Sequence, residues 1–129
     1  MTAMQDGEIT VVNHYRIQSG RPAFLAAVTA LACRVEAEGH PGVPGYRFFC
    51  PDGTNDARAV VRYRDAEAWL GHHDLVMGWP EMTALRSVAD LDEINLFGPI
   101  TDPMREWFGR MGLAGKVRHH GETLAGFRR

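Results

Sequence analysis

The spacing of apolar residues at the start of the chain predicts a β-strand over residues 8–17. Apolar side chains occupy every second position, which places them on one face of a strand. One polar residue, Asn13, interrupts this face in the middle of the strand. The apolar positions of the face are Ile9, Val11, Tyr15 and Ile17. The pattern therefore predicts a half-buried strand with a single amide on its buried side.

A helix over residues 22–38 is predicted to follow this strand. Its apolar residues recur three or four positions apart, Pro22 suits the first turn, and Gly39 suits the position after the last turn. Further along, Gly78 and Pro80 divide one helical region into two helices. The other predicted elements are strands over residues 43–50, 57–64 and 93–100, helices over residues 66–73 and 80–89, and a last helix that Asp102 caps and that ends before Gly112.

The order of these elements is βαββαβ with an extra C-terminal helix. This is the ferredoxin-like arrangement of the α+β class, in which an antiparallel sheet carries its helices on one face. The other face would present a mixture of side chains that is too apolar to remain in water as one patch. Stacking of two such faces in a homodimer is the simplest solution. Residues on that face include Val12, His14, Phe49, Val60 and Phe97.

Length and composition bound the possible functions. The 129 residues suffice for a single domain, and 45% apolar with 23% charged residues is typical of a globular protein. A net charge of -2 provides no broad cationic surface for nucleic acid, and no apolar run approaches the ~20 residues that cross a membrane. The first ten residues lack the basic and apolar regions of a signal peptide, so a cytoplasmic location is expected. Cys33 and Cys50 form no C-x-x-C pair and are expected to be buried reduced thiols.

Two segments resemble the antibiotic biosynthesis monooxygenase family. Tyr63-Arg64-Asp65-Ala66-Glu67-Ala68, followed by Trp69 and His72, is similar to the family's junction between an aromatic-ended strand and a helix, and Asn95-Leu96-Phe97-Gly98-Pro99-Ile100 is similar to its last strand. The resemblance covers about residues 8–112 of the single domain, residues 1–129. It implies a dimeric α+β barrel. The tail, residues 113–129, shows no strong period, and whether it lies against a partner subunit is left open.

The resemblance implies several possible activities. The family includes oxygenases of aromatic polyketides that use neither metal nor flavin, quinol oxygenases and haem-degrading oxygenases. In the haem-degrading branch, an Asn on the first strand and a Trp on the second helix line the pocket, and Asn13 and Trp69 match those places. The haem-ligating His of that branch falls at Trp79, which makes haem degradation the less favoured activity. His72 or His73 would have to replace that ligand.

Four polar or aromatic residues are candidates for chemistry. Asn13 either bonds a neighbouring backbone group or water, or points into a cleft and donates a hydrogen bond to an oxyanion. Trp69, His72 and His73 share a helix face at positions i, i+3 and i+4. Trp69 would supply an aromatic wall and an N–H donor, and one imidazole would accept a proton near neutral pH. Two adjacent histidines are not expected to face one pocket, and the family resemblance favours His72 as the one that faces inward and acts as the base. A core Trp beside solvated histidines is the alternative.

Further aromatic residues are expected to frame a flat ligand, although aromatic residues in strands more often belong to a plain core. The interruption at residues 78–80 favours a pocket between the sheet and the helices. No His, Cys or acidic residues show metal-ligand spacing, so neither a metal nor another cofactor is expected. The expected substrate-binding residues are Tyr15, Tyr46, Phe48, His73 and Trp79.

Together these features favour a cofactor-independent monooxygenase that acts on an electron-rich aromatic molecule, such as a phenol, a hydroquinone or a polyketide. Asn13, Trp69 and His72 would be its catalytic residues, and the deprotonated substrate would itself reduce oxygen. Two other functions are left open. One is a non-catalytic module that binds an apolar small molecule in the same cleft, and the other is a subunit whose function is assembly.

Overall fold

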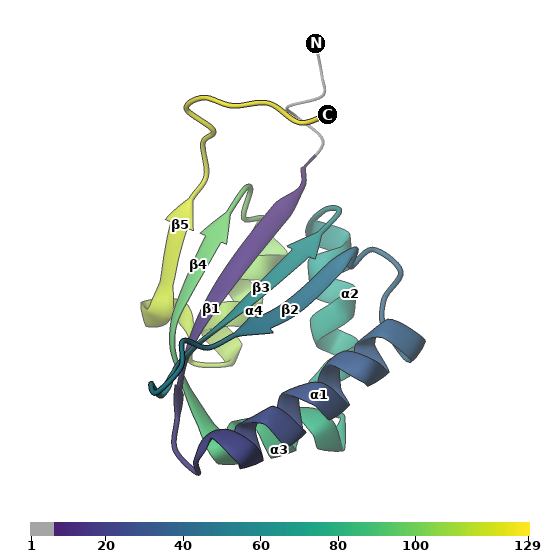
Figure 1. Cartoon of the computed structure of the whole chain (residues 1–129). Coiled ribbons are helices and arrows are strands. Elements are labelled where there is room, and N and C mark those ends of the chain that lie inside the picture. Colours follow the sequence, from purple (N-terminus) through teal and green to yellow (C-terminus); the bar gives the residue numbers. More distant parts are fainter. Residues whose placement is uncertain (1–6) are drawn as a thin grey trace.

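A five-stranded sheet with helices on one face forms the body of the protein (Figure 1). The computed structural model describes residues 7–129. The expectation that no signal peptide is present concerns residues 1–10, of which residues 1–6 lie outside the described part. The strands are β1 (Ile9–Ile17), β2 (Gly45–Phe49), β3 (Asp56–Tyr63), β4 (Ala89–Phe97) and β5 (Val117–His120). The helices are α1 (Arg21–Glu38), α2 (Ala66–Val76), α3 (Pro80–Val88) and α4 (Asp102–Arg110), and a 3-10 turn, η2, covers Ala114–Lys116. Within the described residues, no helix has the length and hydropathy needed to cross a membrane.

The strands lie in the order β2-β3-β1-β4-β5. The first four pair antiparallel in the ferredoxin-like order that the sequence predicts, with β1 between β3 and β4. The tail adds a fifth strand that the sequence did not predict, because β5 pairs parallel to β4 at one edge of the sheet. The chain passes from β4 to β5 through α4, and a helical crossover of this kind brings the next strand into the sheet in the same direction. Part of the unassigned tail therefore extends the sheet.

The strand β4 begins at Ala89, earlier than the predicted strand over residues 93–100. Its register against β1 shifts between His14 and Tyr15, so that Asp92 has no partner across the ladder. Such a β-bulge adds one residue to one strand and shifts the later side chains out of strict alternation. The first half of β4 therefore did not show a regular strand pattern in the sequence.

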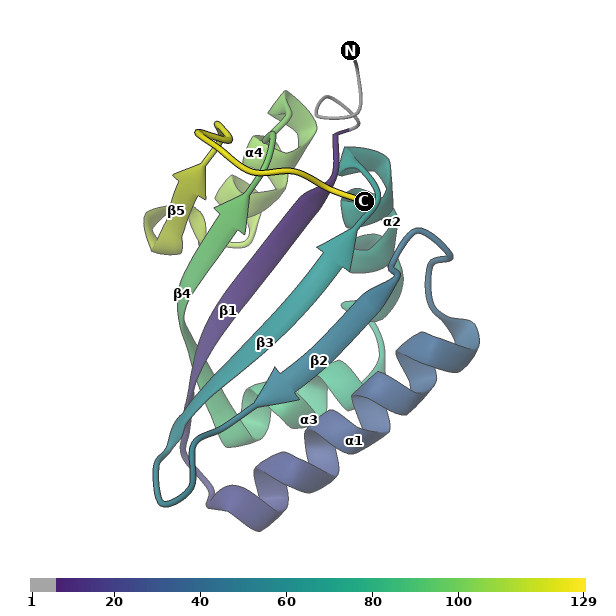
Figure 2. The same cartoon turned by 45° about the horizontal axis from the view of Figure 1, so that its top comes forward.

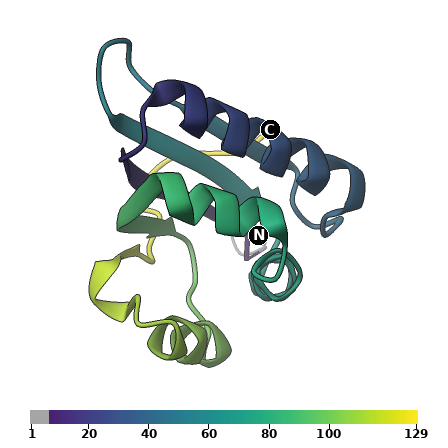
Figure 3. The same ribbon diagram turned by 90° about the horizontal axis from the view of Figure 1, so that it is seen from below.

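The helices cover the same side of the sheet, as the ferredoxin-like order predicts. Seen from below, α1 and α3 lie side by side, and α2 and α4 lie on the other side of α3 (Figure 3). The apolar residues predicted on the inner face of β1 are buried beneath them, whereas Val12 and His14 on the outer face are half-buried. The indole rings of Trp69 and Trp107 join α2 to α4, with 5.2 Å between their centroids. The predicted one-sided packing is confirmed.

The outer face of the sheet carries no helix among the described residues (Figure 2). Phe49 and Phe97 are exposed on it, but each ring has a polar neighbour. The guanidinium of Arg47 lies 5.1 Å from the ring centroid of Phe49, and His120 stacks on Phe97 at 4.5 Å. This face is thus a mixture of apolar and charged groups.

Side-chain caps begin two of the helices. Asp65 caps α2 as predicted, since its carboxylate accepts a hydrogen bond from the backbone N–H of Ala68 at 2.8 Å. The predicted cap of α4 by Asp102 is wrong by one residue. Thr101 is the N-cap, and its hydroxyl oxygen accepts from the backbone N–H of Met104 at 3.4 Å. Asp102 lies in the first turn, where its negative charge interacts favourably with the helix dipole.

The end of β4 depends on a glycine. Gly98 follows the strand with a φ angle of 126°, and a Cβ atom there would lie 2.6 Å from the backbone oxygen of Glu8. We expect Gly98→Ala to lower the free energy of unfolding by roughly 1–3 kcal/mol, because the φ angle and the contact both disfavour a side chain. Urea denaturation measures this change. Gly115→Ala is the matched control, because no atom lies within 4 Å of a Cβ atom at that position. Equal stability of the two variants would contradict the expectation.

Candidate functional site

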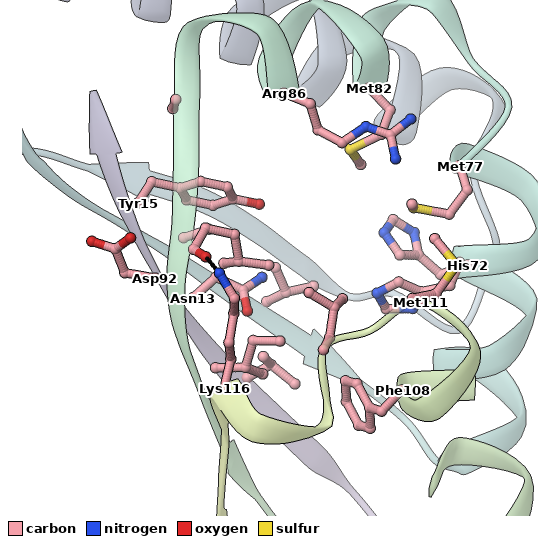
Figure 4. Close-up of a pocket in the computed structure, with 18 of the residues that line it drawn as sticks. Asn13, Tyr15, His72, Met77, Met82, Arg86, Asp92, Phe108, Met111 and Lys116 are labelled. Carbon is pink, nitrogen blue, oxygen red and sulfur yellow. Dashed lines mark hydrogen bonds between the residues drawn. The ribbon is translucent and has the colours of Figure 1, made fainter. Parts of the chain in front are cut away.

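A cavity of about 480 Å³ lies between the inner face of the sheet and helices α2, α3 and α4 (Figure 4). Cavities of this size accommodate small organic ligands. The strands β1 to β4, the three helices and η2 all contribute to its wall. The predicted site residues in the wall are Asn13, Tyr15, Tyr46, Phe48, Trp69, His72 and His73. The structure thus brings together residues that the sequence places on β1, β2 and α2.

Trp79 is the one predicted site residue that does not line this cavity. It is the N-cap residue of α3, and its buried ring lies under the guanidinium of Arg34, 4.2 Å from the ring centroid. The indole packs at the junction between α2 and α3, and the structure does not bring it together with the other predicted substrate-binding residues. At the place of the haem ligand in the resemblance, it also offers no imidazole nitrogen.

Asn13 projects from the middle of β1 into the cavity (Figure 4). Its side chain makes no hydrogen bond with the residues that the structure describes. The side chain thus faces a cleft, which is one of the alternatives left open by the sequence, and it bonds no neighbouring backbone group among the described residues. The amide is therefore available to a ligand, to which it can both donate and accept a hydrogen bond.

His72 is a buried histidine with an unpaired nitrogen. Its side chain lies on the inner side of α2 and is 2% exposed, and Nδ1 has no hydrogen-bond partner among residues 7–129. The rings of Tyr46 and Tyr63 lie next to it, with centroids at 5.4 and 5.6 Å. Burial lowers the pKa of His72 to about 3, and the neighbouring His73 and His40 act in the same direction. The imidazole is therefore neutral at pH 7, far from the near-neutral titration that the sequence suggested.

His73 also lines the cavity, contrary to the expectation that only one of two adjacent histidines would do so. The two imidazole rings are perpendicular, with centroids 5.1 Å apart, and the cavity is wide enough to contact both. The Nδ1 atom of His73 donates a hydrogen bond to the carbonyl oxygen of Trp69 at 2.7 Å. Burial lowers the pKa of His73 to about 4, while this hydrogen bond acts in the opposite direction. A hydrogen bond thus orients His73, whereas the described residues offer none to Nδ1 of His72.

Three tyrosines in the wall keep their protons. Burial raises the pKa of Tyr15 to about 12, and it raises the pKa values of Tyr46 and Tyr63 as well. A neutral phenol both donates and accepts hydrogen bonds. The cavity therefore combines aromatic surface with uncharged polar groups on its sheet side.

Several wall residues were not identified from the sequence. Trp107 and Phe108 on α4, with Met111 at its C-terminal end, close one side of the cavity. Arg86 on α3 and Lys116 in η2 gave no signal, because a charged residue in a last helical turn or in a polar tail is usually solvated. The wall residues missed include Tyr63, Met77, Met82, Arg86, Trp107, Phe108, Met111 and Lys116. Within the described residues, no group of His, Cys, Asp and Glu side chains is arranged to hold a metal ion.

Neither a protein-family model nor a curated protein sequence matches the chain. Solved structures do match it. MupZ from Pseudomonas fluorescens superimposes with a TM-score of 0.70 at 17% identity, over 95% of each chain. SnoaB from Streptomyces nogalater, a cofactor-independent oxygenase, gives a TM-score of 0.63 at 21% identity, over 74% of this chain and 95% of its own. A candidate antibiotic biosynthesis monooxygenase from Caulobacter crescentus CB15 gives a TM-score of 0.63 at 19% identity, over 74% and 92% of the two chains.

These likenesses agree with the resemblance that the sequence motifs carry. At such low identity, a common architecture does not by itself transfer an activity. The chain therefore has the fold of the antibiotic biosynthesis monooxygenases, a mixed α+β ferredoxin-like sheet with helices on one face.

Proposed function

We propose that the protein is a cofactor-independent monooxygenase of an electron-rich aromatic molecule, such as a phenol, a hydroquinone or a polyketide. The proposal is carried by the cavity, in which Asn13 and His72 have no hydrogen-bond partner among the described residues. Aromatic and thioether walls suit a flat apolar ligand, and unpaired polar groups suit its hydroxyl or carbonyl oxygens. The fold shared with SnoaB, a cofactor-independent oxygenase, supports the same class of reaction.

The reaction requires no external reductant, because the substrate supplies the electrons. Loss of a proton from a phenol or an activated C–H bond leaves an anion that transfers electrons to O₂. When a methylene group between aromatic rings reacts with one O₂, a carbonyl oxygen replaces the two hydrogen atoms and one water molecule is released. The tasks of the protein are to bind the substrate, accept its proton and stabilise the oxyanion.

His72 is the proton acceptor in this scheme, and Asn13 is the donor to the oxyanion. The imidazole is neutral before substrate binds, because burial lowers its pKa to about 3. An anion formed beside the ring favours the protonated imidazole, so the pKa of His72 rises as the substrate loses its proton. Trp69 adds aromatic surface, and its indole N–H is a further donor.

We also propose that two copies of the chain pair through the outer faces of their sheets. The apolar side chains Val12, Val60, Phe49 and Phe97 lie on this face, and the helices leave it uncovered. The charged residues around them, such as Arg47, would then form the polar surroundings of an apolar centre, as is usual in protein interfaces.

Oxygen uptake with an anthrone or a hydroquinone tests the proposed reaction. We expect the wild-type protein to exceed the spontaneous rate, also after dialysis against EDTA and without flavin or haem absorbance. Asn13→Ala should lower kcat about 100-fold through loss of an oxyanion donor, and His72→Phe should lower it at least as much. Both variants should keep their thermal stability, because each removes a polar group that has no partner in the described structure.

Asn55→Ala and His119→Ala are the controls, because both side chains are exposed and outside the cavity wall. They should retain wild-type uptake. Tight binding of the anthrone without uptake would contradict an enzyme and leave a binding module. A large loss of stability in Asn13→Ala would show that the amide is a packing residue.

The buried histidines predict a fold that loses stability in acid. The pKa values of His72 and His73 are about 3 and about 4 in the folded protein, against 6.5 for an ordinary histidine. Between these values the unfolded chain binds more protons, so the free energy of unfolding falls as the pH decreases from about 6.5 toward 4. We expect each ring to contribute a loss of roughly 2 kcal/mol between pH 7 and pH 5, measured by urea denaturation. His72→Phe should remove about half of this pH dependence. A variant with the full wild-type dependence would contradict the assignment to His72.

Sedimentation equilibrium tests the dimer. We expect the wild-type chain to be dimeric at micromolar concentration and Val12→Arg to be monomeric, because a charge would enter the centre of the interface. Leu25→Arg is the matched control, since Leu25 is 61% exposed on α1, away from the sheet face. A wild-type monomer, or a Val12→Arg variant that remains dimeric, would contradict pairing through this face.

A further inference from the structure

Arg86 is a cation in the cavity wall that has no partner among the described residues. Its side chain extends from the last turn of α3 toward the cavity, on the same helix face as Met82 (Figure 4). The positive charge of Arg86 opposes part of the rise that burial causes in the pKa of Tyr15, which places the guanidinium near that phenol. A guanidinium carries five N–H donors and no acceptor. Arg86 is an exposed residue, so its donors are available to an anionic group at the rim of the cavity.

Lys116 provides a second cation in the same wall. It lies in η2, across the cavity from α3 (Figure 4). Its ammonium group donates one hydrogen bond to the backbone oxygen of Leu91 at 2.7 Å and forms no ion pair with the described residues. An ammonium group has three N–H donors, so two are left after this bond. The bond fixes the position of the charge without neutralising it.

The carboxylates of the wall do not pair with these two cations. Asp90 and Asp92 both pair with Arg16, at 3.4 and 3.3 Å, and Gln18 donates a further hydrogen bond to Asp90 at 2.9 Å. Asp92 lies on the far side of β4 from the side chains of Arg86 and Met82 (Figure 4). The wall thus carries three cations, Arg16, Arg86 and Lys116, against two carboxylates that both pair with Arg16, which leaves a net charge of +1. Neither Arg86 nor Lys116 has an ion-pair partner among the described residues, so both can face an anionic ligand.

We propose that the ligand of this cavity is an aromatic acid, whose carboxylate is bound by Arg86 with Lys116 as a supporting charge. The planar fork of a guanidinium matches the two oxygens of a carboxylate, which makes Arg86 the main contact. The aromatic part lies against the rings on the sheet side, and for this part the inference rests on the proposed function. Binding of the carboxylate near α3 would also determine which edge of the ring system meets His72 and Asn13.

Two ligands of equal shape and different charge test this inference. Anthracene-2-carboxylate and anthracene-2-carboxamide share one ring system, and neither requires turnover to be detected by fluorescence titration. We expect the wild-type protein to bind the carboxylate at least about tenfold more tightly than the amide, and this ratio to fall as salt is added. Arg86→Gln should abolish the preference, Arg86→Lys should keep part of it, and Lys116→Gln should reduce it severalfold.

Arg105→Gln is the matched control, because Arg105 is an exposed arginine on α4 outside the cavity wall. It should bind both ligands as the wild type does. Equal binding of the acid and the amide by the wild type would overturn the inference, but it would still agree with an aromatic ligand in the cavity. A preference that persists in Arg86→Gln would overturn the role of Arg86, and failure of both ligands to bind would overturn the inference together with the aromatic ligand. A preference for the acid in a protein without oxygen uptake would support this inference and contradict the proposed reaction.

Discussion

The packing of Trp79 at the break between α2 and α3 determines where the cavity lies. The backbone N–H of Trp79 donates to the carbonyl oxygen of Val76 at 3.0 Å, which closes the turn after α2. Its ring is covered by Arg34 from α1, and Arg34 also binds Glu81 on α3 at 2.9 Å. These contacts hold α3 beside α1, as Figure 3 shows. The inner face of the sheet between α3 and α4 is consequently not filled by a continuous helix, and the cavity occupies this space.

The spacing of apolar residues was sufficient to predict those helices and strands that bury one face of a single continuous segment. The inner face of β1 and the helices α1 and α3 follow this rule, because one buried face imposes its spacing on the sequence. The bulge at Asp92 and the parallel strand β5 do not, since both depend on pairing with another strand. The four residues of β5 are mostly polar and lie at an edge, so their sequence resembles that of a loop. Such features become visible only when the partner strand is known.

The candidate site was predictable to the extent that its residues contrast with their neighbours. Asn13 in an apolar strand and His72 on an apolar helix face stand out for this reason. Trp79 is aromatic like several residues that line the cavity. The sequence around it does not indicate on which side of the junction between α2 and α3 its ring lies. The sequence around Arg86 does not indicate that it borders a cavity either, because an arginine beside a cavity and one elsewhere on the surface have the same local sequence pattern. Orientation in space, which depends on how α3 packs on α1, decides both cases.

The central position of β1 has a consequence for folding during synthesis. One edge of β1 pairs with β3, but the other edge pairs with β4, which ends at Phe97. The ribosome therefore releases β1 long before its second neighbour exists, and an unpaired strand edge is prone to pairing with other chains. Closing so long a loop also slows the search for the native pairing. Of the five strands, β1 is synthesised first and waits longest for its second partner, so one of its edges stays open to other pairings until β4 is complete.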